Sequence, residues 1–390
     1  MGQDLPLFSI VGSDPEINEE ALKVLEDEKR EVVVICAHGK SGAGKSTFLK
    51  KVAGETTIDT DAGKKLGIRF WKGDFFDDKS KTLILLNTQG IDTAARDDDE
   101  LINRNLFVLS YFLSNVYIWM EKGAIDLNSL SFLKDADHFR SHDSEEVAKH
   151  APKFIWVARD GPRAWPPGDA TANFNEHYEK LRLREGTTSR GSFNRTSLSG
   201  SADEVISFKT QRQRFAEFFP EGTSRVRKCF NTITTDEFDD EESEEAIMAE
   251  KALNDFLEYL HGSCNEAKKI SGFPINGPLF VELARHFMEC LKEDKICMTM
   301  TCNDIVKKRI LGDAIEHLEA KLEEVKDKMP MTEKMLENFV RNAREDAEKL
   351  IREGSGSERQ QKSILDSFNT RADRVQDSIN TENREVHRKM

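Results

Sequence analysis

The chain has 390 residues and a formal net charge of −14, with 38% hydrophobic and 33% charged residues. This length can bury a sizeable core in two globular domains, while the acidic balance argues against a nucleic-acid-binding surface and against general attraction to anionic membranes. No run approaches the roughly 18 apolar residues of a membrane span, so we expect no integral membrane segment. The six cysteines show neither a disulfide framework nor paired metal-site spacing, which indicates reduced thiols and a cytoplasmic protein.

The first clear structural signal follows an acidic lead-in of about 30 residues. Within that lead-in, Asn18 to Lys29 has the pattern of a helix. Glu31 to Ala37 is rich in valine and isoleucine, which is typical of a buried strand. A glycine-rich turn from His38 to Gly44 comes next, and Lys45 to Val52 is predicted to be helical.

This strand, turn and helix contain a complete phosphate-binding loop of the form G-x-x-x-x-G-K-S. Its glycines let backbone N–H groups converge on phosphate oxygens, and the positive end of the helix faces the same oxygens. Lys45 can reach the β- and γ-phosphates, and Ser46 can place its hydroxyl on Mg²⁺. The predicted nucleotide-binding residues here are Gly39, Lys40, Ser41, Gly42, Ala43, Gly44, Lys45, Ser46 and Thr47.

The segments after this helix suggest two switches. The polar stretch Gly54 to Leu66 lies where a phosphate-loop nucleotidase carries a mobile switch over the γ-phosphate. Gly67 to Trp71 resumes strand character, Asp74 to Lys81 is predicted to be a polar turn, and Thr82 to Leu86 is a second buried strand.

The second buried strand runs directly into Asn87-Thr88-Gln89-Gly90. Phosphate-loop enzymes need a group here that holds the Mg²⁺ shell, normally Asp, and a glycine whose N–H meets the γ-phosphate. Gly90 fits the glycine, and Asn87 takes the acidic position without its charge, as an indirect metal contact. Alone the tetrapeptide would be a plain turn, but in this context it indicates a second switch. We assign Lys45 and Gln89 as the catalytic residues.

Further strands and helices alternate downstream. Elements are predicted at 97–114 (helix), 116–120 (strand), 127–139 (helix) and 153–158 (strand). Arg159-Asp160 stands at the end of the last strand, and ligands of open parallel sheets bind outside the carboxyl ends of strands. An Arg-Asp pair is by itself usually a surface ion pair. Here it predicts base recognition, because a carboxylate accepts two N–H bonds from the guanine edge that adenine cannot supply.

The C-terminal part has a different pattern. Helices at 202–219, 245–260 and 278–292, with a last strand at 227–233, complete the first part. From Asn303 onward three helices are predicted at 303–328, 331–352 and 357–388, each charged on one side and apolar on the other. The fold class is therefore α/β, with a phosphate-loop GTPase domain of mostly parallel sheet at 1–300 and an all-α helical bundle segment at 301–390.

With these residues in view, the chain resembles the guanylate-binding protein and atlastin group of dynamin-like large GTPases. The resemblance spans roughly Val32 to Lys292, and its most specific parts are GIRFW at 67–71, LLNTQGI at 85–91 and FIWVARD at 154–160. It implies a GTPase domain followed by a helical domain. It also implies GTP as substrate, Mg²⁺ as cofactor and a nucleotide-dependent homodimer formed through the GTPase domains.

Three positions depart from the pattern of that group. Gly42 stands where the group commonly carries a catalytic arginine, Lys65 where it has a switch threonine, and Asn87 where it has Asp. An arginine finger is worth about 10³–10⁵ in rate, and Lys40 or a dimer partner's arginine would replace it only in part. We therefore expect GTP to bind well and to be hydrolysed slowly.

Two alternative functions remain open. Gly42 and Asn87 favour a nucleotide-gated scaffold with negligible hydrolysis. The phosphate loop taken alone would equally suit an ATP-using enzyme, but Arg159-Asp160 argues against it, because a guanine-reading carboxylate has no purpose in an ATPase.

Overall fold

The computed structural model forms two compact units, Met1–Lys268 with Asn276–Met298, and Lys269–Ile275 with Thr299–Met390. Residues 55–66 of the predicted first switch, the predicted helix at 127–139, residues 202–218 of the predicted helix at 202–219, and Asp160 lie outside the residues that the structure describes. The described residues are 3–11, 14–54, 67–76, 78–90, 97–122, 151–159, 219, 229–232, 244–263, 265–270, 273–292, 299–326, 328–353 and 358–389.

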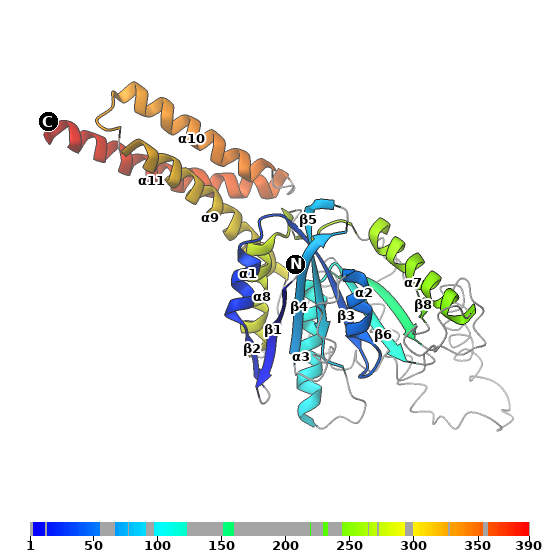
Figure 1. Cartoon of the computed structure of the whole chain (residues 1–390). Helices are drawn as coiled ribbons and strands as arrows, with labels where there is room; N and C mark the ends of the chain where they lie inside the picture. Colours follow the sequence, from blue (N-terminus) through cyan, green and yellow to red (C-terminus); the bar gives the residue numbers. More distant parts are fainter. Residues whose placement is uncertain are drawn as a thin grey trace, which may run out of the picture. The chain divides into compact units, whose positions relative to one another are not determined.

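The first unit is built on one mixed sheet. Its strands are β1 (Gln3–Val11), β2 (Asp14–Ile17), β3 (Glu31–Gly39), β4 (Gly67–Phe75), β5 (Asp78–Thr88), β6 (Val116–Lys122), β7 (Lys153–Arg159) and β8 (Cys229–Thr232). In the described part of the chain the order across the sheet is β2-β1-β4-β5-β3-β6-β7-β8 (Figure 1). The strands from β5 to β8 in this order run parallel, and β2, β1 and β4 add an antiparallel edge.

The central strand β3 sets the position of the phosphate loop. It is buried from Val32 to its end, because both faces of the sheet are covered. Asn115, just before β6, fixes the register: its N–H donates to the Val34 carbonyl at 2.8 Å and its Oδ1 accepts from the Val34 N–H at 2.7 Å. In this register Gly39 pairs with Met120 of β6, and on the other side of β3 Ala37 pairs with Asn87 of β5. The strand therefore delivers the loop between the ends of β5 and β6.

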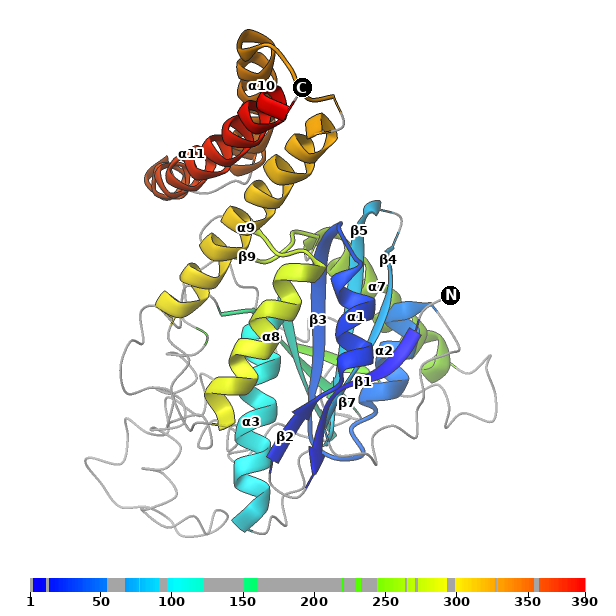
Figure 2. The ribbon, with the colours of Figure 1, turned by 90° about the vertical axis from the view of Figure 1, so that its left-hand side faces the viewer.

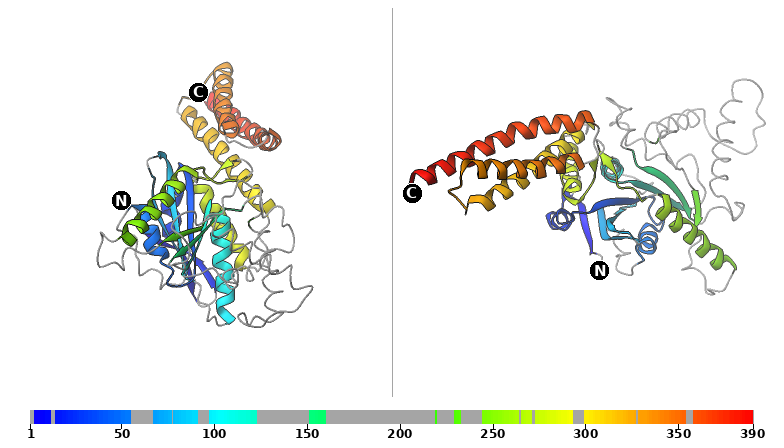
Figure 3. Two further views of the ribbon diagram at one scale, coloured as in Figure 1. Left: turned by 90° about the vertical axis from the view of Figure 1, so that its right-hand side faces the viewer. Right: turned by 90° about the horizontal axis from the view of Figure 1, so that it is seen from above.

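Helices cover both faces of this sheet (Figure 2). They are α1 (Glu19–Glu26), α2 (Lys45–Ala53), α3 (Asp97–Leu113), α7 (Glu244–Ser263) and α8 (Gly277–Lys292). Figure 3 shows α2 and α7 on one face and α3 on the other, from the opposite side. Aromatic contacts connect α3 to the sheet and to α8. The ring centroids of Phe107 in α3 and Tyr117 in β6 lie 5.8 Å apart, and those of Phe112 in α3 and Phe287 in α8 lie 5.2 Å apart.

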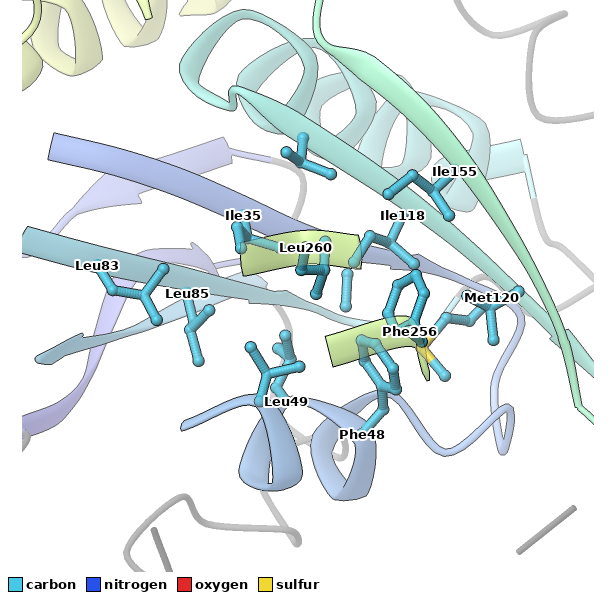
Figure 4. Packing of buried hydrophobic residues seen from close by; sticks show 14 of the residues in the cluster. Ile35, Phe48, Leu49, Leu83, Leu85, Ile118, Met120, Ile155, Phe256 and Leu260 are labelled. Atoms are coloured by element: carbon cyan, nitrogen blue, oxygen red, sulfur yellow. The ribbon is translucent and has the colours of Figure 1, made fainter. Parts of the chain in front are cut away.

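The face under α2 and α7 holds a buried apolar core (Figure 4). Phe48 and Leu49 of α2 and Phe256 and Leu260 of α7 pack against alternate residues of the strands. The rings of Phe48 and Phe256 lie 5.2 Å apart between centroids, and Figure 4 shows Met120 beside them. The core thus supports the first turn of α2, where the phosphate loop ends, and the end of β6, against which the loop begins.

In its described residues, the second unit consists of three long helices and a short hairpin. The helices are α9 (Thr299–Lys326), α10 (Glu333–Glu353) and α11 (Glu358–Lys389), and the hairpin strands are β9 (Lys269–Ile270) and β10 (Phe273–Pro274). Asn383 of α11 is buried, accepts from the Met331 N–H at 2.9 Å and donates to the Met331 carbonyl at 3.0 Å, which holds α11 to the turn before α10. Among the described residues, no helix combines the length and apolar character that crossing a membrane requires.

The predicted fold class is confirmed, with two local differences. β1 and β2 occupy the segment that was expected to be a lead-in. Pro6 sits at a register shift of β1, before the residues of β1 that pair with the edge strand β2, and proline is tolerated at such a position. The expected polar turn at 74–81 is instead the tip of a hairpin, because β4 extends to Phe75 and β5 begins at Asp78. Antiparallel strands tolerate polar residues on a solvated face, so the pattern there does not separate a turn from strand ends.

Candidate nucleotide-binding site

The phosphate loop has the backbone that its glycines were predicted to allow. Gly39 has a φ of 140° and lies against β6 so closely that a Cβ would come within 1.9 Å of the Met120 carbonyl oxygen. Gly42 has a φ of 73°, but a Cβ there would meet no atom within 4 Å. Position 39 therefore requires glycine for close approach, whereas position 42 is open in space and restricted only by its left-handed backbone.

Lys45 lies inside the loop at the start of α2. Its side chain is buried, and its Nζ donates to the Gly39 carbonyl at 3.1 Å and to the Lys40 carbonyl at 2.9 Å. Burial lowers the pKa of Lys45 to about 8. The ammonium is thus held by backbone carbonyls of the loop itself.

Lys40, at the beginning of the loop, connects it to β6. Its N–H donates to the Met120 carbonyl at 3.2 Å, and its carbonyl accepts from the Ala43 N–H at 3.3 Å. Its ammonium forms an ion pair with Glu121 of β6, whose side chain is fully buried. The idea that Lys40 stands in for a missing arginine conflicts with this geometry, because the Lys40 charge is already paired with a carboxylate.

Asn87 and Ser46 meet beside the loop. The Asn87 Nδ2 donates to the Ser46 Oγ at 2.9 Å, although the two residues are 41 positions apart. Asn87 is buried, and its Oδ1 has no hydrogen-bond partner among the described residues. Ser46 and Asn87, which the sequence assigned separately to the metal, therefore contact each other through a neutral amide.

These two side chains fit a Mg²⁺ ion only as a partial ligand set. The Ser46 oxygen keeps a lone pair for a cation, and the orphaned Asn87 Oδ1 can accept from a metal-bound water. No group of three His, Cys, Asp or Glu side chains in the described ranges could hold a metal ion. A cation here would consequently take its remaining oxygen ligands from the nucleotide and from water.

The other second-switch residues lie close to the loop and to β4. A Cβ on Gly90 would fall 2.5 Å from the Ser41 Cα, so its backbone touches the exposed part of the loop. Gln89 pairs with Gly67 at the start of β4: its N–H donates to the Gly67 carbonyl at 2.9 Å, and its Oε1 accepts from the Gly67 N–H at 3.3 Å. The Gln89 amide is therefore held on β4 rather than over the loop.

The remaining predicted residues are placed only in part. Thr47 is half-buried in the first turn of α2. Arg159 ends β7 and pairs in register with Lys122 of β6, so its backbone stands at the same edge of the sheet as the loop. The Arg159 side chain and Asp160 lie outside the part that is described, and base recognition by this pair stays a prediction.

Sequence reasoning did not identify the buried polar residues beneath the loop. His38 is fully buried, contacts the Tyr117 hydroxyl through Nδ1 and packs edge-on against Trp119, with centroids 5.6 Å apart. Burial lowers the pKa of His38 to about 3, and the nearby Lys45 charge adds to this effect. The sequence signal for buried polar residues was weak here, because His38 and Glu121 each follow an apolar run, where a strand normally ends.

The comparison with known families agrees with this geometry. The family model described as guanylate-binding protein, N-terminal domain, matches residues 13–247. The chain belongs to this family. The match covers the phosphate loop, the second switch and Arg159-Asp160, and it confirms the resemblance seen in the sequence.

Relatives in this family are distant in sequence. Human guanylate-binding protein 2 is 23% identical over 385 residues, covering 88% of this chain and 61% of its own length. Guanylate-binding protein 5 of Mus musculus is 25% identical over 301 residues, covering 70% and 48%. The chain thus spans about half to three fifths of these relatives. A crystal structure of an Aquifex aeolicus Era variant bound to GDP.AlF4- matches at 14% identity with a TM-score of 0.28, over 61% of this chain and 58% of that one.

Proposed function

We propose that this chain binds guanine nucleotides with Mg²⁺ and hydrolyses GTP slowly. The observation that carries the proposal is the assembled loop, in which the buried Lys45 and the Asn87–Ser46 pair lie at the carboxyl end of β3. Membership of the guanylate-binding protein family supports guanine as the base. Arg159 and Asp160 are the residues proposed to read it.

Each loop residue has a role in this proposal. Lys45 would exchange the Gly39 and Lys40 carbonyls for β- and γ-phosphate oxygens, which are stronger partners for an ammonium. Ser46 would contribute its hydroxyl to Mg²⁺, and Asn87 would orient that hydroxyl and accept from a water. Bound Mg²⁺ supplies charge neutralisation of the phosphates. Gln89 would have to leave Gly67 before it could orient an attacking water.

Slow hydrolysis follows from the charges available at the loop. No guanidinium is present at Gly42, and the Lys40 ammonium is paired with Glu121. Asn87 brings no negative charge to the metal. Catalysis of phosphoryl transfer rests mainly on positioned charge, so this site holds the substrate with less stabilisation of the transition state.

A scaffold that binds GTP and barely hydrolyses it is the second candidate. The neutral Asn87 and Gly42 favour this function as well. The two candidates differ only in the rate of GTP hydrolysis. In either case we propose a GTPase domain at 1–300, a helical domain at 301–390, a cytoplasmic location and homodimerisation through the GTPase domain. The activities of the longer relatives enter here only as proposals.

The decisive test measures the binding and turnover of GTP and ATP side by side. Lys45→Ala should lower GTP affinity at least about 100-fold, because it removes the fixed charge facing the phosphates. Lys50→Ala, later in the same helix, is the matched control and should keep the wild-type affinity. A near-normal GTP affinity in a folded K45A protein would contradict the assignment of the phosphate loop. Equal affinity of the wild-type protein for ATP and GTP would contradict the assignment of guanine as the base.

A further inference from the structure

Lys40 connects the phosphate loop to β6 and to Lys45. Its N–H binds the Met120 carbonyl at 3.2 Å, and its own carbonyl accepts from the Lys45 Nζ at 2.9 Å. Its ammonium pairs with Glu121, which is 81 positions away in the sequence. A single residue therefore joins β6, the loop and the lysine of the motif.

Glu121 is an unusual residue for the end of a strand. Its side chain is fully buried, and Lys40 is its ion-pair partner within the described residues. Its second carboxylate oxygen, Oε2, is buried and has no hydrogen-bond partner there. A buried carboxylate with one counter-charge depends strongly on that charge, because water does not screen it.

We propose that Glu121 is a positioning residue of the nucleotide site: it holds Lys40 against β6 and so keeps the phosphate loop in its binding conformation. This inference rests on the proposed nucleotide binding. Gly39 lies against the Met120 carbonyl with no room for a side chain, so the loop begins in direct contact with β6. The Lys40–Glu121 pair extends this contact to the next residue of each strand, beside the carbonyl that orients Lys45.

The pair has a second consequence for an anionic ligand. Removal of the Lys40 charge would leave a buried carboxylate beside a loop that binds phosphates. Like charges in a poorly screened environment repel strongly. Removal of the Glu121 charge would release the Lys40 side chain but leave no uncompensated anion. The two losses therefore differ in size, and their combination should be less harmful than the loss of Lys40 alone.

The test measures the affinity of a fluorescent GDP and of a non-hydrolysable GTP analogue for four variants, with melting temperatures recorded in parallel. Lys40→Met should weaken binding about tenfold or more, whereas Lys40→Arg should stay within about threefold of wild type. Glu121→Gln, which keeps the size of the side chain, should weaken binding by about threefold, and the K40M/E121Q double variant should match it. If K40M does not fold, the nucleotide affinity of the isosteric E121Q variant tests the proposal by itself.

Arg30→Met is the matched control. Arg30 pairs with Glu28 at 2.8 Å, and that carboxylate is also buried, but the pair lies at the opposite end of β3 from the loop. R30M should lower the melting temperature and leave nucleotide affinity unchanged. The positioning role would be overturned by unchanged affinity in E121Q, or by a double variant as weak as K40M. A wild-type chain that binds neither nucleotide would instead overturn the proposed function itself.

Discussion

In the proposed function, Asn87 sets how strongly nucleotide binding depends on Mg²⁺. It donates to the Ser46 hydroxyl at 2.9 Å, whereas an Asp in its place would accept from that hydroxyl and add a negative charge. Its own oxygen is buried and unsatisfied among the described residues. The proposed magnesium site thus lacks the negative charge that an Asp at this position would supply.

Asn87→Asp should make nucleotide binding more dependent on Mg²⁺, by about tenfold, because the added carboxylate attracts the cation and repels a metal-free nucleotide. The measurement is GTP affinity titrated against Mg²⁺ concentration. Asn87→Ala is the control, since it breaks the bond to Ser46 without adding charge and should not increase the dependence. Identical Mg²⁺ curves for N87D and wild type would contradict the assignment of Asn87 to the metal shell.

Gly42 is the second position at which this chain lacks a charge that the family commonly has, here that of an arginine. A side chain added there meets no atom within 4 Å, but the φ of 73° is left-handed. Gly42→Arg should therefore raise GTP turnover about tenfold or more, while the backbone strain costs roughly 1–2 kcal/mol of stability. Turnover assays and thermal melts measure the two effects.

Gly42→Ala separates charge from strain at this position. It carries the same left-handed backbone without a guanidinium, so it should lower the melting temperature as much as G42R does and leave turnover unchanged. Equal turnover in G42A and G42R would show that the missing arginine does not limit the rate.

At the scale of elements, a charged network joins α1, β3, β4 and α8 at the edge of the sheet away from the loop. The Glu28 carboxylate accepts from Arg30 at 2.8 and 2.9 Å, and Lys72 of β4 lies 3.7 Å from it. The Glu28 carbonyl accepts from the Gly277 N–H at 3.0 Å, where α8 begins. A Cβ on Gly277 would lie 1.9 Å from the Leu25 carbonyl oxygen, so only glycine permits this close packing of α8 on α1.

This network should make stability depend on pH in the acid range. Hydrogen bonds from Arg30 lower the pKa of Glu28 to about 2 from an ordinary value of 4.5. A lowered folded-state pKa means that the stabilisation is complete above pH 4.5 and is lost as the pH falls toward 2. Its size at neutral pH is about 1–2 kcal/mol, because water screens part of the interaction with the partly exposed Arg30 side chain.

Glu28→Gln tests this contribution. The variant should be less stable at neutral pH, and its free energy of unfolding should fall less between pH 5 and pH 2 than that of the wild type. Glu20→Gln, at an exposed position of α1, is the control and should follow the wild-type curve. If the free energy of unfolding, measured in urea, fell equally with pH in E28Q and in the wild type, Glu28 would not contribute to the loss of stability in acid.

At the scale of the whole molecule, family membership motivates one further prediction. We expect the chain to form a dimer through its nucleotide face when GTP or a transition-state mimic is bound. Light scattering of the protein with GTP, with GDP and with the mimic measures the mass in each state. K45A, which should not bind nucleotide, is the control and should remain monomeric throughout. The same mass in all three states of the wild type would refute nucleotide-dependent dimerisation.

Much of this molecule could be read from local patterns. A valine-rich run, a glycine turn and a helix within Glu31 to Val52 specified the phosphate loop, because strand, turn and helix signals act over a few residues. The three C-terminal helices followed from their 3.6-residue periodicity in the same way. The strands β1 and β2 were not predicted, since a proline within each strand and charged neighbours weaken the local signal for a strand.

The tertiary structure alone decided which residues meet at the site. Ser46 and Asn87 are 41 positions apart, and Lys40 and Glu121 are 81 apart. Their contacts depend on the order of β5, β3 and β6 in the sheet and on the register of β3 with each of these two neighbours. Asn115 holds the register between β3 and β6. A shift of one residue would turn these side chains to the other face of the sheet. Local sequence thus determined that a phosphate loop forms, and strand pairing determined that a buried glutamate holds it.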